Sequence, residues 1–388
     1  MRCRAGGACG ARSDEGASDE GALAACRDAD AILIISAYLH AEVIRELKSC
    51  RIISRIGTGV DKIDIAEATR KGIIVNNLPN AFTDEVADHT LALLLAAARK
   101  IKELDRDMRL GRKPVSIAGF HRLSAQTVGI IGFGLIGRAV AKRCRAFGLT
   151  VLANDPCLTA EQAAAEGVTI ADLDTLLAES DYVCPLCPLL PSTRGMLAMP
   201  QLQKMKRTAV LVNTGRGELT NEDDLATALH EGVIRYAALD VFGCVNVFAE
   251  GGFPTSHALF NLENVLLTPH IAAASEEAGG ECQRRSAQAV VDVLSGRWPE
   301  HPVNTDVTPW FQERWRECYE RTLNAERNQR GLEEEAGNRC GQADVRDLCG
   351  HRVLAGRRDR PAAGGGDAAV DPARAIRQSR HAGDVPPA

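Results

Sequence analysis

The sequence has no long hydrophobic run and no strong excess of one charge. Its longest uninterrupted apolar stretch is residues 91–98, far short of the roughly 20 residues that a membrane-spanning helix needs. No apolar stretch follows Arg2 and Arg4, so the pattern of a secretory signal is also lacking. The 46 lysines and arginines nearly balance the 51 aspartates and glutamates, and a net charge of −5 does not favour nucleic-acid binding. We therefore expect a cytoplasmic protein with no membrane and no nucleic acid as partner.

Metal-ligand spacing is missing as well, although the chain has 13 cysteines. Only Cys184 and Cys187 form a C-x-x-C pair, and no second pair lies at the distance typical of zinc sites. Histidine, aspartate and glutamate do not cluster at ligand spacing either. We expect no metal site, and we interpret the pair as small hydrophobes whose thiols are reduced in a cytoplasm.

The two ends of the chain differ from its middle. At 388 residues, with 45% hydrophobic and 25% charged residues, the chain is long enough for two or more globular domains. Residues 1–27 contain almost no β-branched or aromatic side chains, and residues 311–388 alternate charge with glycine. Neither end has the apolar periodicity that offsets the entropy of ordering a chain. We expect both ends to be largely disordered.

The middle of the chain alternates strand and helix signals. Short apolar runs predict buried strands, amphipathic stretches between them predict helices, and a second such series covers residues 127–269. This alternation indicates parallel sheets with helices on their faces. In the first series we expect strands at residues 31–36, 51–56 and 73–76, and helices at residues 41–48, 65–70 and 84–100.

A glycine-rich turn opens the second series. A short apolar strand runs into Gly132-Phe-Gly134-Leu-Ile-Gly137, and a helical pattern follows at once. Gly132 permits a tight turn, Gly134 lets the backbone approach a pyrophosphate, and Gly137 lets the helix pack close to the strand. Asp155 ends the next expected strand, where a carboxylate accepts hydrogen bonds from an adenosine ribose and repels a 2′-phosphate. The turn therefore predicts a dinucleotide cofactor, NAD rather than NADP.

Five further motifs accompany the turn. They are Gly57-Thr-Gly-Val-Asp-Lys-Ile-Asp64, Asn76-Asn-Leu-Pro-Asn80, Val212-Asn-Thr-Gly-Arg-Gly217, Ala238-Leu-Asp-Val-Phe242 and Leu267-Thr-Pro-His-Ile-Ala272. Over about residues 28–306 the chain resembles the D-isomer-specific 2-hydroxyacid dehydrogenase family. The resemblance implies an α/β fold: a Rossmann NAD-binding domain inserted into a flavodoxin-like substrate domain, both doubly wound parallel sheets. The substrate domain would cover residues 28–100 plus 288–310, and the NAD-binding domain residues 101–287.

The reaction of that family needs a cation for the substrate carboxylate and an acid for the developing alkoxide. Arg216 suits the first task because its planar fork can hold carboxylate and carbonyl oxygens together. His270 suits the second, as general acid/base, because an ordinary imidazole titrates near neutrality. By resemblance, Asp240 orients the nicotinamide carboxamide, and the backbone at Thr58 and Gly59 holds the substrate. The resemblance also implies cofactor contacts at Leu135, Ile136, Pro188 and Thr214. We interpret His40, His89, His121, His230 and His257 as ordinary surface or core histidines.

One position departs from the family pattern. The family usually has L-D-V-F-E-x-E-P, and its second glutamate pairs with the histidine and raises the imidazolium pKa. This chain has Val245 at that place. Glu250, in the loop that follows, which we expect to be longer than in the family, is our candidate third catalytic residue; the other interpretation is a solvated loop carboxylate.

Further residues bear on the substrate and on the assembly. The phosphoglycerate dehydrogenase branch has an arginine just before the serine of its first substrate loop, whereas this chain has Ile35 before Ser36, which disfavours 3-phosphoglycerate. The alternative function is an NAD-sensing corepressor-like binding protein with little turnover, as in the C-terminal-binding-protein branch. We favour the NAD-dependent dehydrogenase acting on a small 2-hydroxy or 2-keto acid. The resemblance also implies a homodimer formed through an arm at about residues 104–122.

Overall fold

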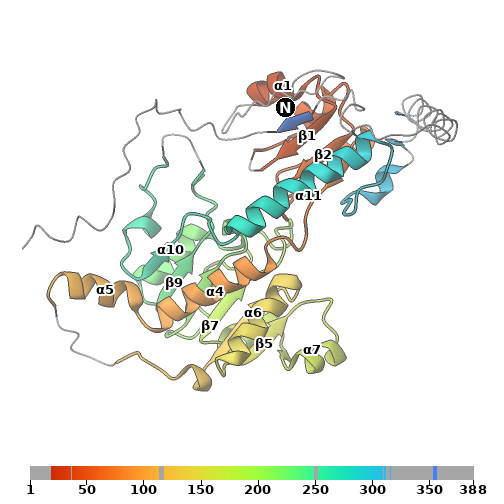
Figure 1. The fold of residues 1–388 in the computed structure, drawn as a ribbon. Helices are drawn as coiled ribbons and strands as arrows, with labels where there is room; N and C mark the ends of the chain where they lie inside the picture. Colours follow the sequence, from red (N-terminus) through yellow and green to blue (C-terminus); the bar gives the residue numbers. More distant parts are fainter. Residues whose placement is uncertain are drawn as a thin grey trace, which may run out of the picture. The chain divides into compact units, whose positions relative to one another are not determined.

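The computed structural model describes residues 19–35, 37–112, 118–248, 252–308, 310, 311, 315 and 353–355. All of them belong to one compact unit within Met1–Gly356, which contains two parallel β-sheets (Figure 1). The α/β class with parallel sheets, expected from the alternating apolar pattern, is confirmed.

The larger sheet has seven strands in the order β10-β9-β8-β7-β4-β5-β6, all parallel. The strand order reverses between β4 and β7, and in open α/β sheets this is where ligands bind. The strands are β4 Thr127–Ile131, β5 Thr150–Asn154, β6 Thr169–Ile170, β7 Tyr182–Pro185, β8 Val210–Asn213, β9 Tyr236–Leu239 and β10 Val265–Leu267. Their helices are α6 Leu135–Ala146, α7 Ala160–Glu166, α8 Leu173–Glu179, α9 Met199–Leu202 and α10 Glu222–His230.

One long helix, α4 (Thr83–Ala98), packs against the larger sheet and against α6. Its buried leucines Leu93 and Leu94 join a core that contains residues of β4, β8 and β9. At its N-terminal end, Asp84 and Asp88 both pair with Arg143 of α6. The Thr90 hydroxyl lies 2.6 Å from that of Thr214, which directly follows β8, so the first half of the helix lies beside the carboxyl edge of the sheet, where the candidate site is formed.

The smaller sheet has four parallel strands in the order β11-β1-β2-β3. Side chains alternate between its two faces: Ile53 and Val75 pack under α2 and α3, while Ile52 and Ile74 pack under α11. The helix α11 lies across β1 and β2 (Figure 1). The elements are β1 Ala31–Ile34, β2 Ile52–Arg55, β3 Ile74–Asn76, β11 Val353–Ala355, α1 Asp19–Cys26, α2 Ala41–Arg45, α3 Ile65–Arg70 and α11 Glu276–Leu294.

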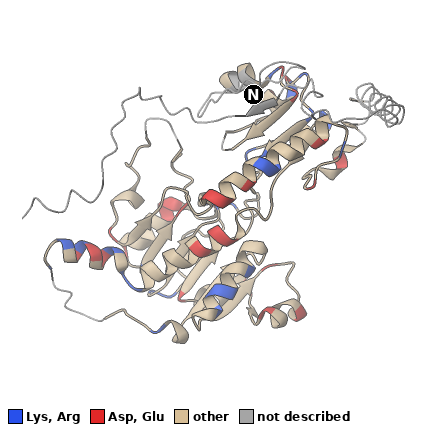
Figure 2. Cartoon of the chain, viewed as in Figure 1, with Lys and Arg blue, Asp and Glu red and all other residues tan. Residues whose placement is uncertain are grey.

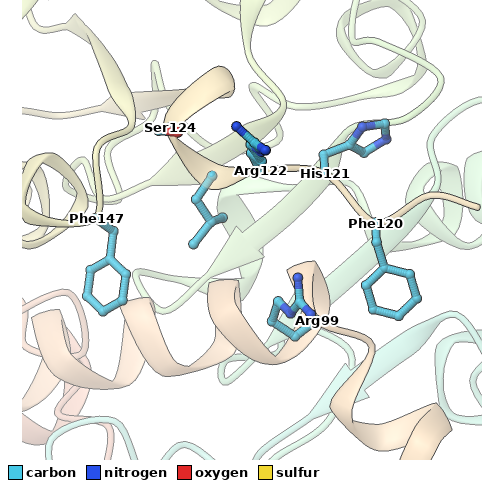
Figure 3. Close-up of a pocket in the computed structure, with 7 residues that line it drawn as sticks. Arg99, Phe120, His121, Arg122, Ser124 and Phe147 are labelled. Carbon is cyan, nitrogen blue, oxygen red and sulfur yellow. The ribbon is translucent and has the colours of Figure 1, made fainter. Parts of the chain in front are cut away.

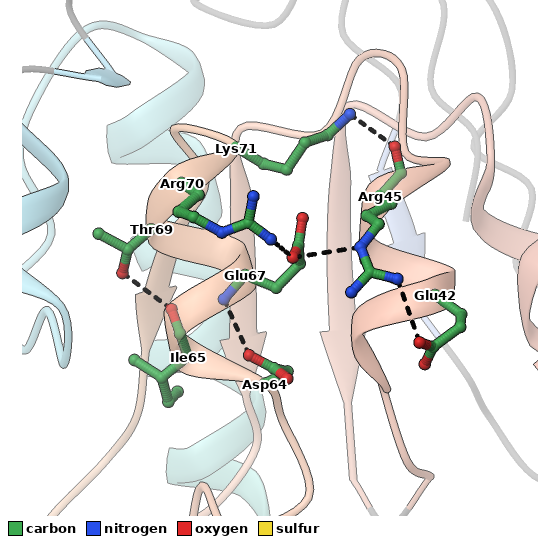
Figure 4. Close-up of polar contacts among 8 residues, drawn as sticks. All are labelled: Glu42, Arg45, Asp64, Ile65, Glu67, Thr69, Arg70 and Lys71. Carbon is green, nitrogen blue, oxygen red and sulfur yellow. Dashed lines mark hydrogen bonds and ion pairs between the residues drawn. The ribbon is translucent and has the colours of Figure 1, made fainter.

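A buried glutamate joins two helices of the smaller sheet. The Glu67 side chain is 4% exposed and lies within ion-pair distance of Arg45 on α2 and of Arg70, one turn further along α3 (Figure 4). The carboxylate of Asp64 accepts a 2.8 Å hydrogen bond from the Glu67 amide and caps α3. These contacts fix the start of α3, and with it the end of the 57–64 loop that enters the candidate site.

The structure departs from the sequence expectations at three places. Asp19–Cys26 forms a helix within the segment expected to be disordered, because Cys26 reaches the core under α2. Phe311 is 1% exposed and the Trp315 indole donates to the carbonyl of Gly72 at 3.1 Å, so ordered packing continues past residue 310. The helix expected at residues 84–100 ends earlier, and a separate helix, α5 (Ile101–Arg109), follows Lys100, whose φ is +53°.

The remaining elements are short 3-10 helices at Leu123–Ala125, Gly217–Leu219, Ala258–Asn261 and Thr305–Val307. Over the described part of the chain, no helix has the length and apolar composition needed to span a bilayer. Within the same ranges, no three histidine, cysteine, aspartate or glutamate side chains are grouped so that they could hold a metal ion.

Candidate active site

The glycine turn between β4 and α6 has a different structural reason for each of its glycines. Gly132 has a φ of +94°, and a Cβ there would lie 2.5 Å from the backbone nitrogen of Cys187. A Cβ on Gly137 would collide with the carbonyl oxygen of Gly132, so only glycine lets α6 pack this close to the strand. A Cβ on Gly134 would meet no heavy atom within 4 Å. The backbone is therefore open at the N-terminus of α6, where a pyrophosphate can approach the free N–H groups.

Asp155 lies directly after β5, beside this turn. Its Oδ2 accepts a hydrogen bond from the Phe133 amide at 2.7 Å, and its Oδ1 accepts one from the Cys157 amide at 2.8 Å. Each carboxylate oxygen keeps a further lone pair that a ribose hydroxyl can use. The turn and the carboxylate together fit a dinucleotide such as NAD.

The other expected cofactor positions lie along the same edge of the sheet. Leu135 and Ile136 begin α6, while Pro188 and Thr214 follow β7 and β8. Thr214 is 6% exposed, and its hydroxyl lies 2.6 Å from the hydroxyl of Thr90 on α4. The four positions therefore flank the point between β4 and β7 where the strand order reverses.

Arg216 packs directly onto the loop that follows β2. Its Nε and Nη2 donate to Oδ1 of Asp61 at 3.1 and 3.0 Å, and a Cβ on Gly59 would collide with Nη2. Burial acts to raise the pKa of the Asp61 carboxyl, but the charge and hydrogen bonds of Arg216, a backbone hydrogen bond and the charge of Lys62 together lower it. The Thr58 hydroxyl donates to the carbonyl of Leu78 at 3.0 Å, which fixes the same loop. The structure therefore brings together the expected substrate-binding residues.

Asp240 and His270 meet at the end of β9 and β10. The Asp240 carboxylate is fully buried and accepts hydrogen bonds from the Thr268 hydroxyl at 2.6 Å and from the amides of Ile271 and Ala272 at 3.0 Å. His270 lies between these donors in a left-handed backbone conformation, with a φ of +54°. Burial raises the pKa of Asp240, but hydrogen bonds from His89, Thr268 and the two amides lower it overall. The carboxylate is thus the anchor of the His270 loop.

The surroundings of His270 lower the pKa of its imidazole from the ordinary value of 6.5. Desolvation is the largest cause, and the charges of Arg216, Lys62 and Arg55 act in the same direction, while Asp240 opposes them. These interactions also show that Arg216 and His270 belong to one electrostatic site. The imidazole faces the ring of Phe248, with the two ring centroids 5.1 Å apart.

The position expected to hold the family glutamate lies in the loop that also carries Phe248. Val245 is half-buried in the loop after β9, and its apolar side chain cannot pair with an imidazolium. Glu250, the candidate substitute, lies outside the described residues. Among the residues that the structure does describe, Asp240 is the carboxylate whose charge raises the pKa of His270.

Two residues that the motifs did not single out join the site. Arg55 ends β2, its Nε donates to the carbonyl of Gly59 at 3.1 Å, and burial together with Arg216 lowers its pKa to about 10. A cation at the end of an otherwise buried strand is a signal that could have found it. His89 on α4 lies 3.0 Å from the Thr268 hydroxyl, and nothing in its local sequence distinguishes it from the other histidines.

Comparison with known proteins agrees with this arrangement. Residues 91–272 match the family profile described as D-isomer specific 2-hydroxyacid dehydrogenase, NAD binding domain. A glyoxylate reductase of Korarchaeum cryptofilum is 38% identical over 296 residues, covering 74% of this chain and 87% of that protein. A D-3-phosphoglycerate dehydrogenase of Archaeoglobus fulgidus is 40% identical over 266 residues, covering 69% of this chain and 49% of that protein. The chain thus spans about half the length of this relative.

Solved structures give the same grouping. The crystal structure of D-lactate dehydrogenase from Aquifex aeolicus, complexed with NAD and lactic acid, superposes with a TM-score of 0.65 at 28% identity. The match covers 71% of this chain and 85% of that one. The names of these relatives are those of enzymes, which does not favour the corepressor-like alternative. The chain belongs to the family of D-isomer-specific 2-hydroxyacid dehydrogenases, with an NAD-binding domain of the Rossmann type.

Proposed function

We propose that this protein interconverts a small D-2-hydroxy acid and its 2-keto acid, with Arg216 binding the substrate carboxylate and His270 acting as general acid/base. The observation that carries the proposal is the placement of both side chains on one edge of the larger sheet: Arg216 follows β8 and packs on Gly59, and His270 follows β10. The charge of Arg216 acts on the imidazole of His270, and the open glycine turn after β4 lies on the same edge.

In this proposal the protein supplies binding, orientation and a proton. Gly132, Gly134, Gly137 and Asp155 would hold NAD, which would supply or take up the hydride at the substrate carbon. The guanidinium of Arg216 holds the carboxylate, and the Thr58–Gly59 backbone holds its other side. In the reducing direction the imidazolium of His270 donates its proton to the oxygen that was the carbonyl; in the oxidising direction the neutral ring accepts the hydroxyl proton. The remaining cofactor contacts are assigned to Leu135, Ile136, Pro188, Thr214 and Asp240.

Two parts of this assignment concern Asp240 and Glu250. Asp240 already uses its oxygens on the His270 loop, so a contact with the nicotinamide carboxamide would share the carboxylate with that loop. Glu250 is proposed as the carboxylate that approaches His270 from the loop after β9.

The division into a substrate domain (28–100 plus 288–310) and an NAD-binding domain (101–287) is likewise proposed, and the packing of α11 on the smaller sheet supports it.

The test is NADH oxidation across a panel of 2-keto acids that begins with glyoxylate, which the name of one relative suggests as substrate. We expect turnover in the wild type, and a loss of about 100-fold or more in kcat/KM for Arg216→Ala and His270→Ala. NADH affinity, followed by fluorescence, should stay within about 2-fold in both variants because neither residue lies at the glycine turn. Binding of NADH without turnover on any keto acid would contradict the proposal.

The proposed setting of the enzyme is a homodimer in the cytoplasm. The eight cysteines that the described residues contain are all free thiols, which suits a reducing compartment. The arm at residues 104–122 would form the dimer contact. Most of α5 lies in this segment. A pocket opens at the end of α4 (Figure 3), and it is lined by Arg99, Phe120, His121, Arg122, Leu123, Ser124 and Phe147.

A further inference from the structure

The segment that carries His270 is held from both ends by one face of α4. At its start, the Nε2 atom of His89 lies 3.0 Å from the Thr268 hydroxyl. At its end, the Ser275 hydroxyl donates to Oε1 of Glu85 at 2.8 Å. Glu85 and His89 are four residues apart on the helix and therefore point from the same face. The helix thus contacts the segment on both sides of His270.

The direction of the hydrogen bonds makes His89 a donor. The hydroxyl proton of Thr268 goes to Oδ1 of Asp240 at 2.6 Å, so the Thr268 oxygen can only accept from His89. The Nε2 atom also lies 3.5 Å from Oδ1 of Asp240. A chain of donors therefore runs from His89 through Thr268 to the buried carboxylate that holds the amides of Ile271 and Ala272.

This chain matters because the backbone of His270 is in an unfavourable conformation. A non-glycine residue with positive φ stays in place only when its surroundings hold it there. The supporting bonds come from Asp240, and Asp240 in turn is fixed by Thr268. A cavity lies along this side of the segment, and it is lined by Asp84, Glu85, Asp88, His89, Ala92, Ile271, Ala272, Ala274, Ser275 and Glu277.

We propose that His89 is a positioning residue for catalysis: by donating to Thr268 it fixes Asp240 and thereby holds His270 at the substrate, with Glu85 securing the other end of the segment. This inference rests on the proposed role of His270. It assigns to α4 a part in the reaction, although none of its residues is proposed to touch the substrate. The placement also explains how the His270 segment can be held firmly although Val245 stands where the family has a glutamate.

The experiment compares His89→Leu, which removes the donor, with His89→Gln, whose amide nitrogen can reach the same oxygen. We expect kcat for keto-acid reduction to fall about 10- to 100-fold in His89→Leu, the effect of a reacting group that is slightly misplaced. NADH affinity should stay within about 2-fold, and His89→Gln should keep at least half of the wild-type kcat. Asp88→Asn is the matched control, because Asp88 lies on the same helix and lines the same cavity. Its kcat and its NADH affinity should equal those of the wild type.

Hydrogen exchange of the peptide that contains Ile271 and Ala272 supplies a readout independent of turnover. Its amides should exchange at least 10-fold faster in His89→Leu than in the wild type, and at wild-type rate in His89→Gln. If the wild type turned over no keto acid, the proposed function would fail while this readout still tested the positioning. Wild-type kcat or wild-type exchange in His89→Leu would overturn the inference. Should that variant not fold, Thr268→Val against Thr268→Ser makes the same comparison, with the same two expected outcomes.

Discussion

The imidazole of His270 lies among cations and beside an aromatic ring. Arg216, Lys62 and Arg55 all act to keep it neutral, and Phe248 faces its ring at a centroid distance of 5.1 Å. The buried carboxylate of Asp240 opposes these effects without cancelling them. A histidine in such surroundings is a weaker base than free imidazole, and this should be visible in the pH dependence of both directions of the reaction.

The pH profile is the first prediction. In Glu250→Gln only the described surroundings act on the ring. Because reduction needs the protonated ring, its kcat/KM in this variant should fall as pH rises through a midpoint below 6.5, while oxidation should rise through the same midpoint. In the wild type the proposed contact with Glu250 should place both midpoints higher, because a carboxylate beside the ring raises its pKa. Both rates are measured between pH 5 and pH 9, at saturating cofactor. A midpoint above about 7 in Glu250→Gln would contradict the prediction, and equal midpoints in the two proteins would contradict the role proposed for Glu250.

At the scale of elements, the glycine turn offers two substitutions of equal size whose effects on stability should differ. Gly134→Ala places a methyl group in open space, whereas Gly137→Ala places it against the Gly132 carbonyl. We expect Gly134→Ala to keep the wild-type unfolding midpoint but to weaken NADH binding about 10-fold or more, because the pyrophosphate must approach the backbone there. Gly137→Ala should lower the unfolding midpoint as well, since α6 must move away from β4.

Calorimetry for binding and urea unfolding for stability separate the two cases. Equal effects of Gly134→Ala and Gly137→Ala on both measurements would show that the open surface above Gly134 has no part in cofactor binding.

The elements also show what a sequence can and cannot predict. Strands with continuous apolar runs, the glycine turn and the helix at Ile65–Arg70 were all predictable, because each depends on local periodicity or on a local conformational need. The helix α5 was not, since it buries none of its residues and has no apolar face directed at the core. The link between His89 and Asp240 was not predictable either, because it joins α4 to the ends of β9 and β10, far apart in the chain.

For the whole molecule, the return of the chain to the smaller sheet is the main organising feature. The side chain of Asn304 accepts from the Val75 amide at 2.8 Å and donates to the Ile73 carbonyl at 3.0 Å, so it pairs with β3 almost as a further strand would. Val307 and Phe311 then fill the core under α11. The segment expected to begin a disordered tail therefore starts inside the core of this sheet.

This packing leads to a prediction about two neighbouring aromatic residues. Phe311→Ala should lower the free energy of unfolding by about 3–4 kcal/mol, as for other fully buried phenylalanines. Trp310→Ala, the control, removes a side chain that is 52% exposed and should change that free energy by only about 0.5 kcal/mol. Urea unfolding followed by circular dichroism measures both. A small effect of Phe311→Ala would mean that the segment after Asn304 contributes little to the fold.

The proposed dimer can be tested on the arm helix. Acidic and basic residues lie next to each other along α5 (Figure 2), yet Ile101, Met108 and Leu110 are each more than half exposed. Such an apolar surface on a helix that buries nothing of its own chain suits contact with a second copy. Light scattering should give about twice the 41.6 kDa chain mass, and Met108→Glu combined with Leu110→Glu should reduce it to that of one chain.

A control variant separates the arm from apolar surface in general. Ile170→Glu introduces the same charged side chain at an exposed apolar position of the edge strand β6, where Ile170 is 41% exposed, and should leave the mass unchanged. The monomeric double variant should still bind NADH, because every residue assigned to the cofactor comes from a single chain. A wild-type protein of one chain mass would refute the dimer and leave the assigned site intact. A double variant that loses mass and NADH binding together would show instead that the arm stabilises the larger sheet itself.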